Sequence, residues 1–256
     1  TNSGNCNDGL TEQVTIYVNP TPEMSVVVPD TLICNDADVV FTTDSLVSTL
    51  GEVRYQVDIS YSSGDVSGTV ADGSLHDMGS LTDHLVNTGD DVETVTYTFT
   101  PFIEDGTNSG NCNDGLTEQV TIYVNPTPRF EVTVPDTIVC DSSTVTLSVT
   151  DQLGAVEGTK VYDLTTSYTA GAVVGVSPSD TDIAMGTPVT DQLINMTNEV
   201  QEVDYTFRYR YNDPRNGNAP FCDHGVDTTI TIYVNPTPRF EVTVPDTIVC
   251  DSSTVT

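Results

Sequence analysis

Basic residues are scarce in this sequence, and Lys160 is its only lysine. Lysine and arginine together number 7 against 38 aspartate and glutamate residues, so the formal net charge is −31. A chain of this charge is repelled by nucleic acid and by anionic membrane surfaces. No apolar run approaches the roughly 20 residues that a membrane-spanning helix requires. We therefore predict neither nucleic acid as a partner nor membrane insertion in this segment.

The sequence also lacks the motifs of common catalytic sites, such as G-x-S-x-G and H-E-x-x-H. Its histidines, His76, His84 and His224, do not recur at equivalent positions, so surface or loop roles explain them better than acid–base or metal chemistry. His224 lies near Cys222, but Cys112 occupies the equivalent loop without a histidine, which favours a disulfide there. We predict no enzymatic activity and no catalytic residue.

What the chain does contain is internal repetition. Residues 1–22 recur unchanged as residues 107–128, and residues 121–146 recur as residues 231–256. The recurring Asn-Pro-Thr-Pro is a poor strand interior, because proline lacks a backbone donor and restricts the residue before it, so it reads as a short extended joint between domains. Self-similarity at this spacing predicts a segment of a longer tandem array.

Domain boundaries follow from these joints. Residues 1–20 are predicted to be the last strand of a preceding repeat. Residues 21–126 and residues 127–236 are predicted to be two complete domains. Residues 237–256 are predicted to be the first strands of a following repeat.

Both complete domains show short alternating segments separated by Gly, Asp and Ser turns. In the last segment of the first domain, Val120, Ile122 and Val124 fall on one face, while Thr121 and Tyr123 fall on the other. No segment has a sustained helical period. Roughly seven strands in about 100 residues predict an all-β fold of tandem immunoglobulin-like sandwiches. The absence of tryptophan excludes an antibody-type domain.

Three phrases carry a resemblance to a known family. They are VPDTIVCDSSTVTLSV near the start of a repeat, VDYTFRYRY late in it, and a cysteine that leads into TTITIYVNPTP at its end. Together they resemble the PKD-like, immunoglobulin-like repeats of giant Bacteroidota cell-surface proteins, of which the gliding-motility adhesins are the best known. The resemblance covers essentially the whole chain. It implies export, an extracellular location at the cell surface, and a linear array of PKD-like domains.

Six cysteines recur in register and without the close pairs that zinc sites use, which favours disulfides in an oxidising compartment. In a seven-stranded sandwich, the turn with Cys34 and the loop with Cys112 lie at opposite poles. A strand of about 10 residues is roughly 33 Å long, whereas bridged Cα atoms lie within about 7 Å. We therefore predict an interdomain bond between Cys34 and Cys222. The cysteines predicted to pair with neighbouring repeats are Cys6, Cys112, Cys140 and Cys250.

Two alternatives to this pairing stay open. A bridge within one domain becomes feasible if the first strand is short or changes sheets, and the thiols could also be free. Another form of covalent strengthening, the Lys–Asn isopeptide bond, is excluded for the first domain because that domain has no lysine.

An Asp-Thr-aliphatic tripeptide occurs at the same point of every repeat, with one Asp-Ser-Leu variant. Bacteroidota attach O-glycans at motifs similar to this one, so the resemblance implies glycosylation. The alternative is that Pro-Asp-Thr only forms a turn. The residues concerned are Thr31, Thr137, Thr247 and Ser45.

Acidic clusters offer the oxygen ligands that calcium prefers, although no EF-hand motif is present. The candidates are Asp36, Asp38, Asp90 and Asp91. A solvated acidic surface is the alternative. No other metal and no cofactor is predicted.

Two functional hypotheses remain. The first is a structural and adhesive segment of a long extracellular fibre, whose partners are neighbouring repeats, identical fibres and surface glycans. A variant has a partner complete the strand of residues 1–20. The second is a carbohydrate- or calcium-dependent binding module of a secreted protein. Its signature would be exposed aromatic residues, for which the candidates are Tyr162, Tyr168 and Tyr209.

Overall fold

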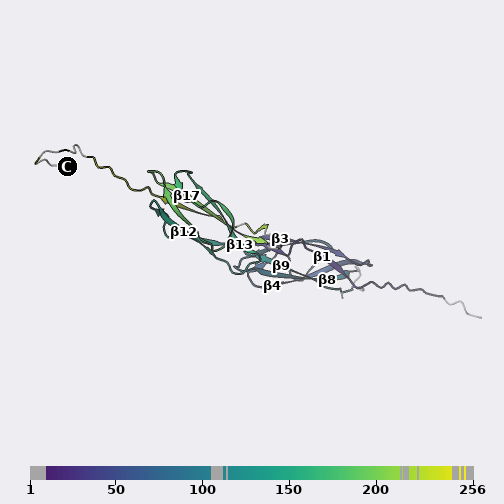
Figure 1. Cartoon of the computed structure of the whole chain (residues 1–256). Coiled ribbons are helices and arrows are strands. Elements are labelled where there is room, and N and C mark those ends of the chain that lie inside the picture. The colour runs from purple at the N-terminus through teal and green to yellow at the C-terminus, as the bar shows by residue number, and fades with distance from the viewer. Residues whose placement is uncertain are drawn as a thin grey trace, which may run out of the picture. The chain divides into compact units, whose positions relative to one another are not determined.

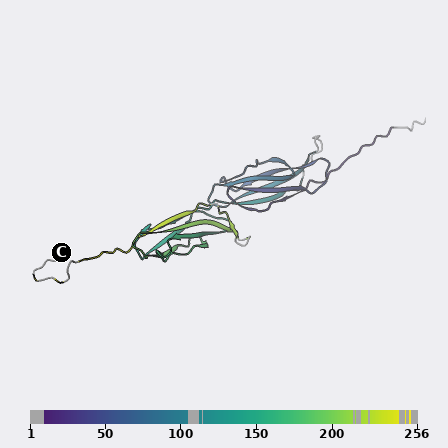
Figure 2. The ribbon, with the colours of Figure 1, turned by 90° about the horizontal axis from the view of Figure 1, so that it is seen from above.

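The computed structural model divides the chain into two compact units, unit 1 (Thr1–Pro126) and unit 2 (Thr127–Thr256). Every element of the described chain that Figures 1 and 2 draw as regular structure is a β-strand. The predicted all-β sandwich fold is therefore confirmed. Among the described residues, no helix has the length and apolar character needed to cross a membrane. The described residues are 10–104, 112, 113, 115–213, 215, 219–223, 225–243, 248 and 251.

Unit 1 contains two sheets, with strand orders β1-β3-β7-β5 and β2-β9-β8-β4-β6. Figure 2 shows the strands of the unit running along its length. The strands are β1 (Met24–Val27), β2 (Leu32–Cys34), β3 (Ala37–Ser45), β4 (Glu52–Tyr61), β5 (Val66–Ser67), β6 (Ser74–Asp77), β7 (Gly79–Asn87), β8 (Glu93–Glu104) and β9 (Glu118–Asn125).

Unit 2 repeats this topology, with sheet orders β10-β12-β16-β14 and β11-β19-β17-β13-β15, and β18 pairs with β17. Its strands are β10 (Phe130–Thr133), β11 (Ile138–Val139), β12 (Ser143–Asp151), β13 (Thr159–Tyr168), β14 (Val173–Val174), β15 (Asp180–Ala184), β16 (Val189–Asn195), β17 (Gln201–Asp213), β18 (Ala219–Phe221) and β19 (Thr228–Val234).

The first strand of each unit changes sheets part-way along. In unit 1, β1 pairs antiparallel with β3, and β2 then pairs parallel with β9 in the opposite sheet. Unit 2 does the same with β10 and β11. Pro29 and Pro135 lie at the two crossing points, where the missing proline donor ends one ladder before the next begins. A change of sheets by the first strand was the condition under which the sequence analysis kept a disulfide within one domain as an alternative.

Each unit has its own hydrophobic core between its sheets. In unit 1, alternate residues of β8 point inward, and Val95, Tyr97 and Phe99 are fully buried. Phe41 of the opposite sheet packs against two of them, with ring centroids 4.6 Å from Tyr97 and 5.3 Å from Phe99. Such aromatic pairs contribute about 0.5–1.5 kcal/mol beyond their buried area. The predicted period-2 alternation thus produces the core.

A buried carboxylate fixes the loop after β5 in unit 1. Asp83 Oδ1 accepts hydrogen bonds from the backbone N–H groups of Thr69 and Val70, at 2.6 and 2.9 Å, and Oδ2 accepts one from the Tyr97 hydroxyl at 2.7 Å. Gly68 approaches so closely that an added Cβ would lie 2.6 Å from Asp83 Oδ2. Burial, and then the Asp83 carboxylate, raise the pKa of Tyr97, so its hydroxyl stays a donor.

Unit 2 builds the same arrangement around Asp191. Its carboxylate accepts hydrogen bonds from the Ser177 backbone N–H at 2.9 Å, the Ser177 hydroxyl at 2.6 Å and the Tyr205 hydroxyl at 2.6 Å. Asp191 and Tyr205 lie on strands equivalent to those of Asp83 and Tyr97. This carboxylate–tyrosine pair is therefore part of the fold of both units rather than a site peculiar to one.

Residues 10–20 contain no strand, although they match part of the sequence that forms β9. Ile16 and Val18 are 81% and 89% exposed, whereas Ile122 and Val124, their sequence equivalents in β9, are fully buried. The same sequence therefore forms a strand only where a neighbouring strand pairs with it.

The boundary between the two units falls within an Asn-Pro-Thr-Pro joint, where the sequence places a domain boundary. The assignment of residues 1–20 to a preceding repeat and of residues 237–256 to a following repeat stays a prediction.

Candidate functional site

The two described cysteines of unit 1 lie at opposite ends of its larger sheet. Cys34 ends β2 beside the C-terminal end of β9, level with Glu93 at the start of β8. Cys112 is bridged to Ile103, near the other end of β8. The intervening stretch of β8 is roughly 33 Å long at about 3.3 Å per residue, and a disulfide needs Cα atoms within about 7 Å. A bond between these two cysteines is excluded, even though the first strand changes sheets.

The cysteines differ in their bonding state. Cys34 is disulfide-bonded, and so is Cys222. Cys222 follows β18, is buried, and has a backbone φ of 50°, a region that residues other than glycine seldom occupy. Cys140 follows β11 and is an exposed free thiol. Cys6 and Cys250 lie outside the described residues.

Two of the predicted glycosylation residues, Thr31 and Thr137, lie in turns that lead into the second half of the first strand. Asp30 Oδ1 accepts a hydrogen bond from the backbone N–H of Leu32 at 2.9 Å, so the tripeptide of Thr31 forms an Asx turn. The equivalent bond in unit 2 joins Asp136 to the residue after Thr137, also at 2.9 Å. This turn explains the recurrence of the tripeptide structurally. Glycosylation stays a prediction.

The accessibility of these hydroxyl-bearing residues differs. Thr137 is exposed and Thr31 is half-buried. Ser45 is half-buried, and its hydroxyl donates a hydrogen bond to the Val47 carbonyl at 3.0 Å. A glycan therefore has its freest access at Thr137. Thr247 lies outside the described residues.

Two of the predicted calcium ligands enclose a histidine instead. The His84 Nδ1 atom lies 2.8 Å from Asp38 Oδ1, and its Nε2 atom lies 3.0 Å from Asp36 Oδ1. Hydrogen bonds to Asp38 and then to Asp36 raise the pKa of His84, because both carboxylates favour the charged imidazolium.

The other two candidates, Asp90 and Asp91, lie in the loop between β7 and β8. Within the part of the chain that the structure describes, no group of three or more His, Cys, Asp or Glu residues is placed to hold a metal ion. Calcium binding at the four predicted ligands gains no support from this geometry. His76 lies in β6, where its ring stacks on Tyr55 at 5.5 Å, and His224 lies outside the described residues.

The aromatic residues expected at an exposed sugar platform are mostly interior. Tyr162 and Tyr209 are fully buried, so that expectation was wrong for both, and Tyr168 alone is substantially exposed, at 41%. The reason is strand register. Tyr162 of β13 and Tyr209 of β17 lie directly opposite each other on the inward face of one sheet, so both rings join the interior.

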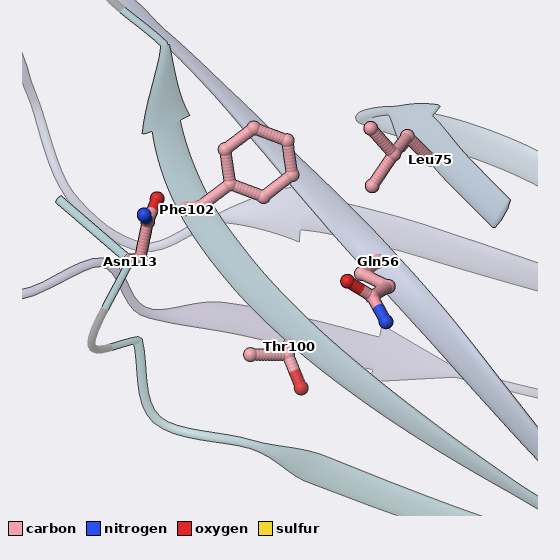
Figure 3. Close-up of a pocket in the computed structure, with 5 residues that line it drawn as sticks. All are labelled: Gln56, Leu75, Thr100, Phe102 and Asn113. Atoms are coloured by element: carbon pink, nitrogen blue, oxygen red, sulfur yellow. The ribbon is translucent and has the colours of Figure 1, made fainter. Parts of the chain in front are cut away.

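An aromatic residue that the sequence reading missed lines a hollow on the outer face of unit 1. The cavity has a volume of about 330 Å³. Figure 3 shows the ring of Phe102 between Asn113 on one side and Leu75 and Gln56 on the other. The signal that could have found it is alternation, since Phe102 lies between the inward-facing Pro101 and Ile103. The cavity is lined by the neutral residues Gln56, Leu75, Thr100, Phe102 and Asn113.

Unit 2 fills the equivalent surface with charges. Strand register aligns Phe102 with Arg210 and Gln56 with Asp163. The Arg210 side chain is 7% exposed and donates two hydrogen bonds of 2.9 Å to Asp163 and one of 2.8 Å to Asp182. The open neutral hollow is thus a property of unit 1.

Comparison with known protein families finds a match within part of the chain. Residues 31–128 match the model of a PKD-like domain. The match extends from the turn before β2 to the joint after β9. No curated protein matches the chain.

Among solved structures, the chain is similar to the D00-D0 domain of intimin, at 13% identity and a TM-score of 0.39, covering 82% of this chain and 98% of that one. It is similar to the Escherichia coli adhesin FdeC, at 13% identity and a TM-score of 0.36, covering 87% and 66%. It is also similar to the Yersinia pseudotuberculosis adhesin InvE, at 15% identity and a TM-score of 0.27, covering 88% and 60%.

Proposed function

We propose that this segment is a structural and adhesive part of a long extracellular surface fibre, in which serial PKD-like sandwiches are stapled by interdomain disulfides. One observation carries the proposal: Cys34 is disulfide-bonded, although it lies about 33 Å from Cys112 along its own sheet. Cys222 is the partner we propose. Such bonds persist in oxidising, extracellular surroundings.

The same bond would join every pair of neighbouring repeats. Cys140 occupies the position of Cys34 in unit 2 and carries a free, exposed thiol. Cys140 would form a disulfide with the loop cysteine of a following repeat. Cys112 would form one with the turn cysteine of a preceding repeat. Each domain would then contact mainly its neighbours, and length would grow by duplication.

The strong acidity fits this role. A net charge of −31 keeps neighbouring fibres soluble and limits their lateral adhesion. The proposal includes export to the cell surface, O-glycans on the exposed turns, and a place among Bacteroidota surface proteins of the gliding-adhesin type.

A non-reducing peptide map of the chain tests the bond. We expect the peptide with Cys34 to be linked to the peptide with Cys222, and Cys34→Ser to release a titratable thiol at Cys222. Cys140→Ser is the matched control, because it removes an exposed thiol at the equivalent turn and should leave the link intact. A Cys34–Cys112 link, or two free thiols, would overturn the stapled fibre.

A second candidate function rests on the hollow of unit 1. Phe102 offers a ring face, and the amides of Gln56 and Asn113 offer donors and acceptors, which is the combination that neutral sugars require. We expect Phe102→Ala to abolish binding on a glycan array. Tyr123→Ala is the control, because Tyr123 is exposed on β9 outside the hollow. Binding that is absent in the unaltered chain, or that survives Phe102→Ala, would remove this function.

A further inference from the structure

The only lysine of the chain is held against an aspartate inside unit 2. The Lys160 Nζ atom, on β13, lies 2.5 Å from Asp151 Oδ2 at the end of β12. The two strands belong to opposite sheets, so the contact crosses the sandwich. The side chains of Lys160 and Asp151 are only 22% and 24% exposed.

Four further groups complete this arrangement. Lys160 Nζ also donates hydrogen bonds to the carbonyls of Leu153 and Gly154, at 3.1 and 2.5 Å. The Tyr209 hydroxyl donates a hydrogen bond to the other carboxylate oxygen, Asp151 Oδ1, at 3.1 Å. The same oxygen accepts a hydrogen bond from the Leu153 backbone N–H, also at 3.1 Å. Every hydrogen of the ammonium therefore has an acceptor, and both oxygens of the carboxylate have donors.

We propose that Lys160 and Asp151 react to form an intramolecular isopeptide bond that joins the two sheets of unit 2. The reaction is a condensation of one amine with one carboxylic acid. It produces one amide and one water, and it needs no oxidant, reductant or cofactor.

The first step is proton transfer across the Nζ–Oδ2 contact, from the ammonium of Lys160 to the carboxylate of Asp151. The two remaining N–H groups stay bonded to the carbonyls of Leu153 and Gly154, so the freed lone pair faces the carboxyl group. Holding nucleophile and electrophile in contact removes most of the entropic barrier to such a reaction.

In the second step, Nζ attacks Cγ of Asp151, and the negative charge develops on Oδ1. The Tyr209 hydroxyl already points at this oxygen and stabilises the charge, as an oxyanion-hole donor does. A proton then passes from Nζ to the Oδ2 hydroxyl, the Cγ–Oδ2 bond breaks, and water leaves. Lys160 is the nucleophile, Asp151 the electrophile, and Tyr209 the stabilising donor.

The donor hydroxyl of Tyr209 lies in apolar surroundings. Tyr209 is fully buried, and its ring makes edge-on contacts with Phe130 at 5.7 Å and Tyr211 at 5.5 Å. Burial also raises the pKa of Tyr209, so its hydroxyl remains protonated and able to donate.

Unit 1 supplies an internal comparison. Strand register places Ser45 where unit 2 has Asp151, Val53 where it has Lys160, and Pro101 where it has Tyr209. All three reacting groups are absent together from the unit that has no lysine. Their joint presence in unit 2 is expected if they act together.

The intact mass of the reduced, denatured chain tests the proposal directly. We expect a deficit of one water. Protease cleavage after Glu157 separates the two residues in sequence, so we expect the fragments with Asp151 and Lys160 to remain joined and trypsin to leave Lys160 uncut. A full mass, with separate fragments, would overturn the proposal without reference to any variant.

Lys160→Arg is the matched control, because it retains a cation and its donors but a guanidinium is a poor nucleophile. We expect this variant to have the full mass. A water deficit that persists in it would show dehydration elsewhere and would overturn the assignment. Tyr209→Phe should form the bond about 10²-fold more slowly, by the usual effect of losing one oxyanion donor; an unchanged rate would eliminate the role of Tyr209.

Discussion

Units 1 and 2 have equivalent sheet orders and the same buried carboxylate–tyrosine pair, yet they differ at several other polar clusters. His84 in unit 1 faces two aspartates, whereas its equivalent Gln192 in unit 2 donates to the Ser142 carbonyl at 3.3 Å. The comparison separates what the fold requires from what each repeat has acquired. Groups that are common to both units hold the sandwich together, and groups found in one unit mark its individual properties.

Arginine placement shows the same contrast. In unit 1, Arg54 on β4 bonds Asp77 at 2.6 Å and Glu104 at 2.8 Å. Arg54 lies opposite Phe102, and the equivalent pair of opposed residues in unit 2 is Val161 and Arg210; we call these two positions the arginine row. In unit 2 the arginine is therefore on β17, and Val161 occupies the position of Arg54. Both arginines tie an edge strand to the centre of the sheet. The requirement is therefore for one cation in the row, and its strand is free to change.

The largest effect is expected from removing the buried carboxylate of the carboxylate–tyrosine pair that both units share. Asp83→Ala and Asp191→Ala each leave a buried tyrosine hydroxyl and a loop N–H without their acceptor, which should cost their own unit about 3 kcal/mol. Urea-dependent hydrogen exchange, read by mass spectrometry on peptides of each unit, measures the two separately. Asp44→Ala is the control, because that exposed carboxylate should matter by less than about 0.5 kcal/mol. A large loss in one unit alone would contradict a common role.

A smaller effect, confined to unit 2, is expected from Arg210→Met. The substitution leaves Asp163 and Asp182 facing each other without the cation, and removing one partner of a fully buried ion pair costs about 3–5 kcal/mol. Because Asp182 is exposed, water offsets part of this cost. The same exchange readout measures the loss. Arg54→Met should change unit 1 far less, since its partners are well exposed; equal losses would show that burial does not separate the two clusters.

Next in size is a pH dependence restricted to unit 1. The folded pKa of His84 is raised above its ordinary value of 6.5, chiefly by hydrogen bonds to Asp38 and then Asp36. Its contribution to stability is therefore fully present below about pH 6.5 and is lost as pH rises through the folded pKa. We expect the unfolding midpoint of unit 1 to fall over this range, relative to His84→Gln, which reproduces Gln192 of unit 2.

Comparison with His84→Gln also removes the contribution of His76. Burial lowers the pKa of His76, so its contribution has the opposite sign and is lost as pH falls. His76 is present in both proteins, and its effect cancels in the difference. A difference that does not change with pH would show that the two aspartates fail to stabilise the charged imidazole.

The sequence predicted the fold well because the fold depends on local signals. Strand alternation at Ile122 and Val124, turn residues and proline joints are all readable without knowledge of partners. The crossing of the first strand between sheets was only left open as an alternative, although Pro29 and Pro135 lie where it occurs. A proline shows that a ladder ends, but not that the chain continues in the opposite sheet.

The sites were harder to predict because they depend on register between strands far apart in sequence. Lys160 meets Asp151 only after the two sheets of unit 2 are assembled, and Phe102 and Gln56 line one hollow only after β4 pairs with β8. The orientation of Tyr162 was misjudged for a related reason. Val161 and Tyr162 are both buried, so burial does not alternate at this point, and the sequence alone does not show which of the two faces the core.

The smallest effect is expected from moving the arginine of unit 1 to the strand that unit 2 uses. Phe102→Arg alone places two guanidinium groups directly opposite, because Arg54 pairs with Phe102 across β4 and β8. Like charges in this position destabilise a sheet. Adding Arg54→Val should remove the repulsion and restore the stability of unit 1. Hydrogen exchange on the two single variants and the double variant gives the coupling between the sites. If the effects simply add, the row does not act as one unit and the proposed interchange of strands is incorrect.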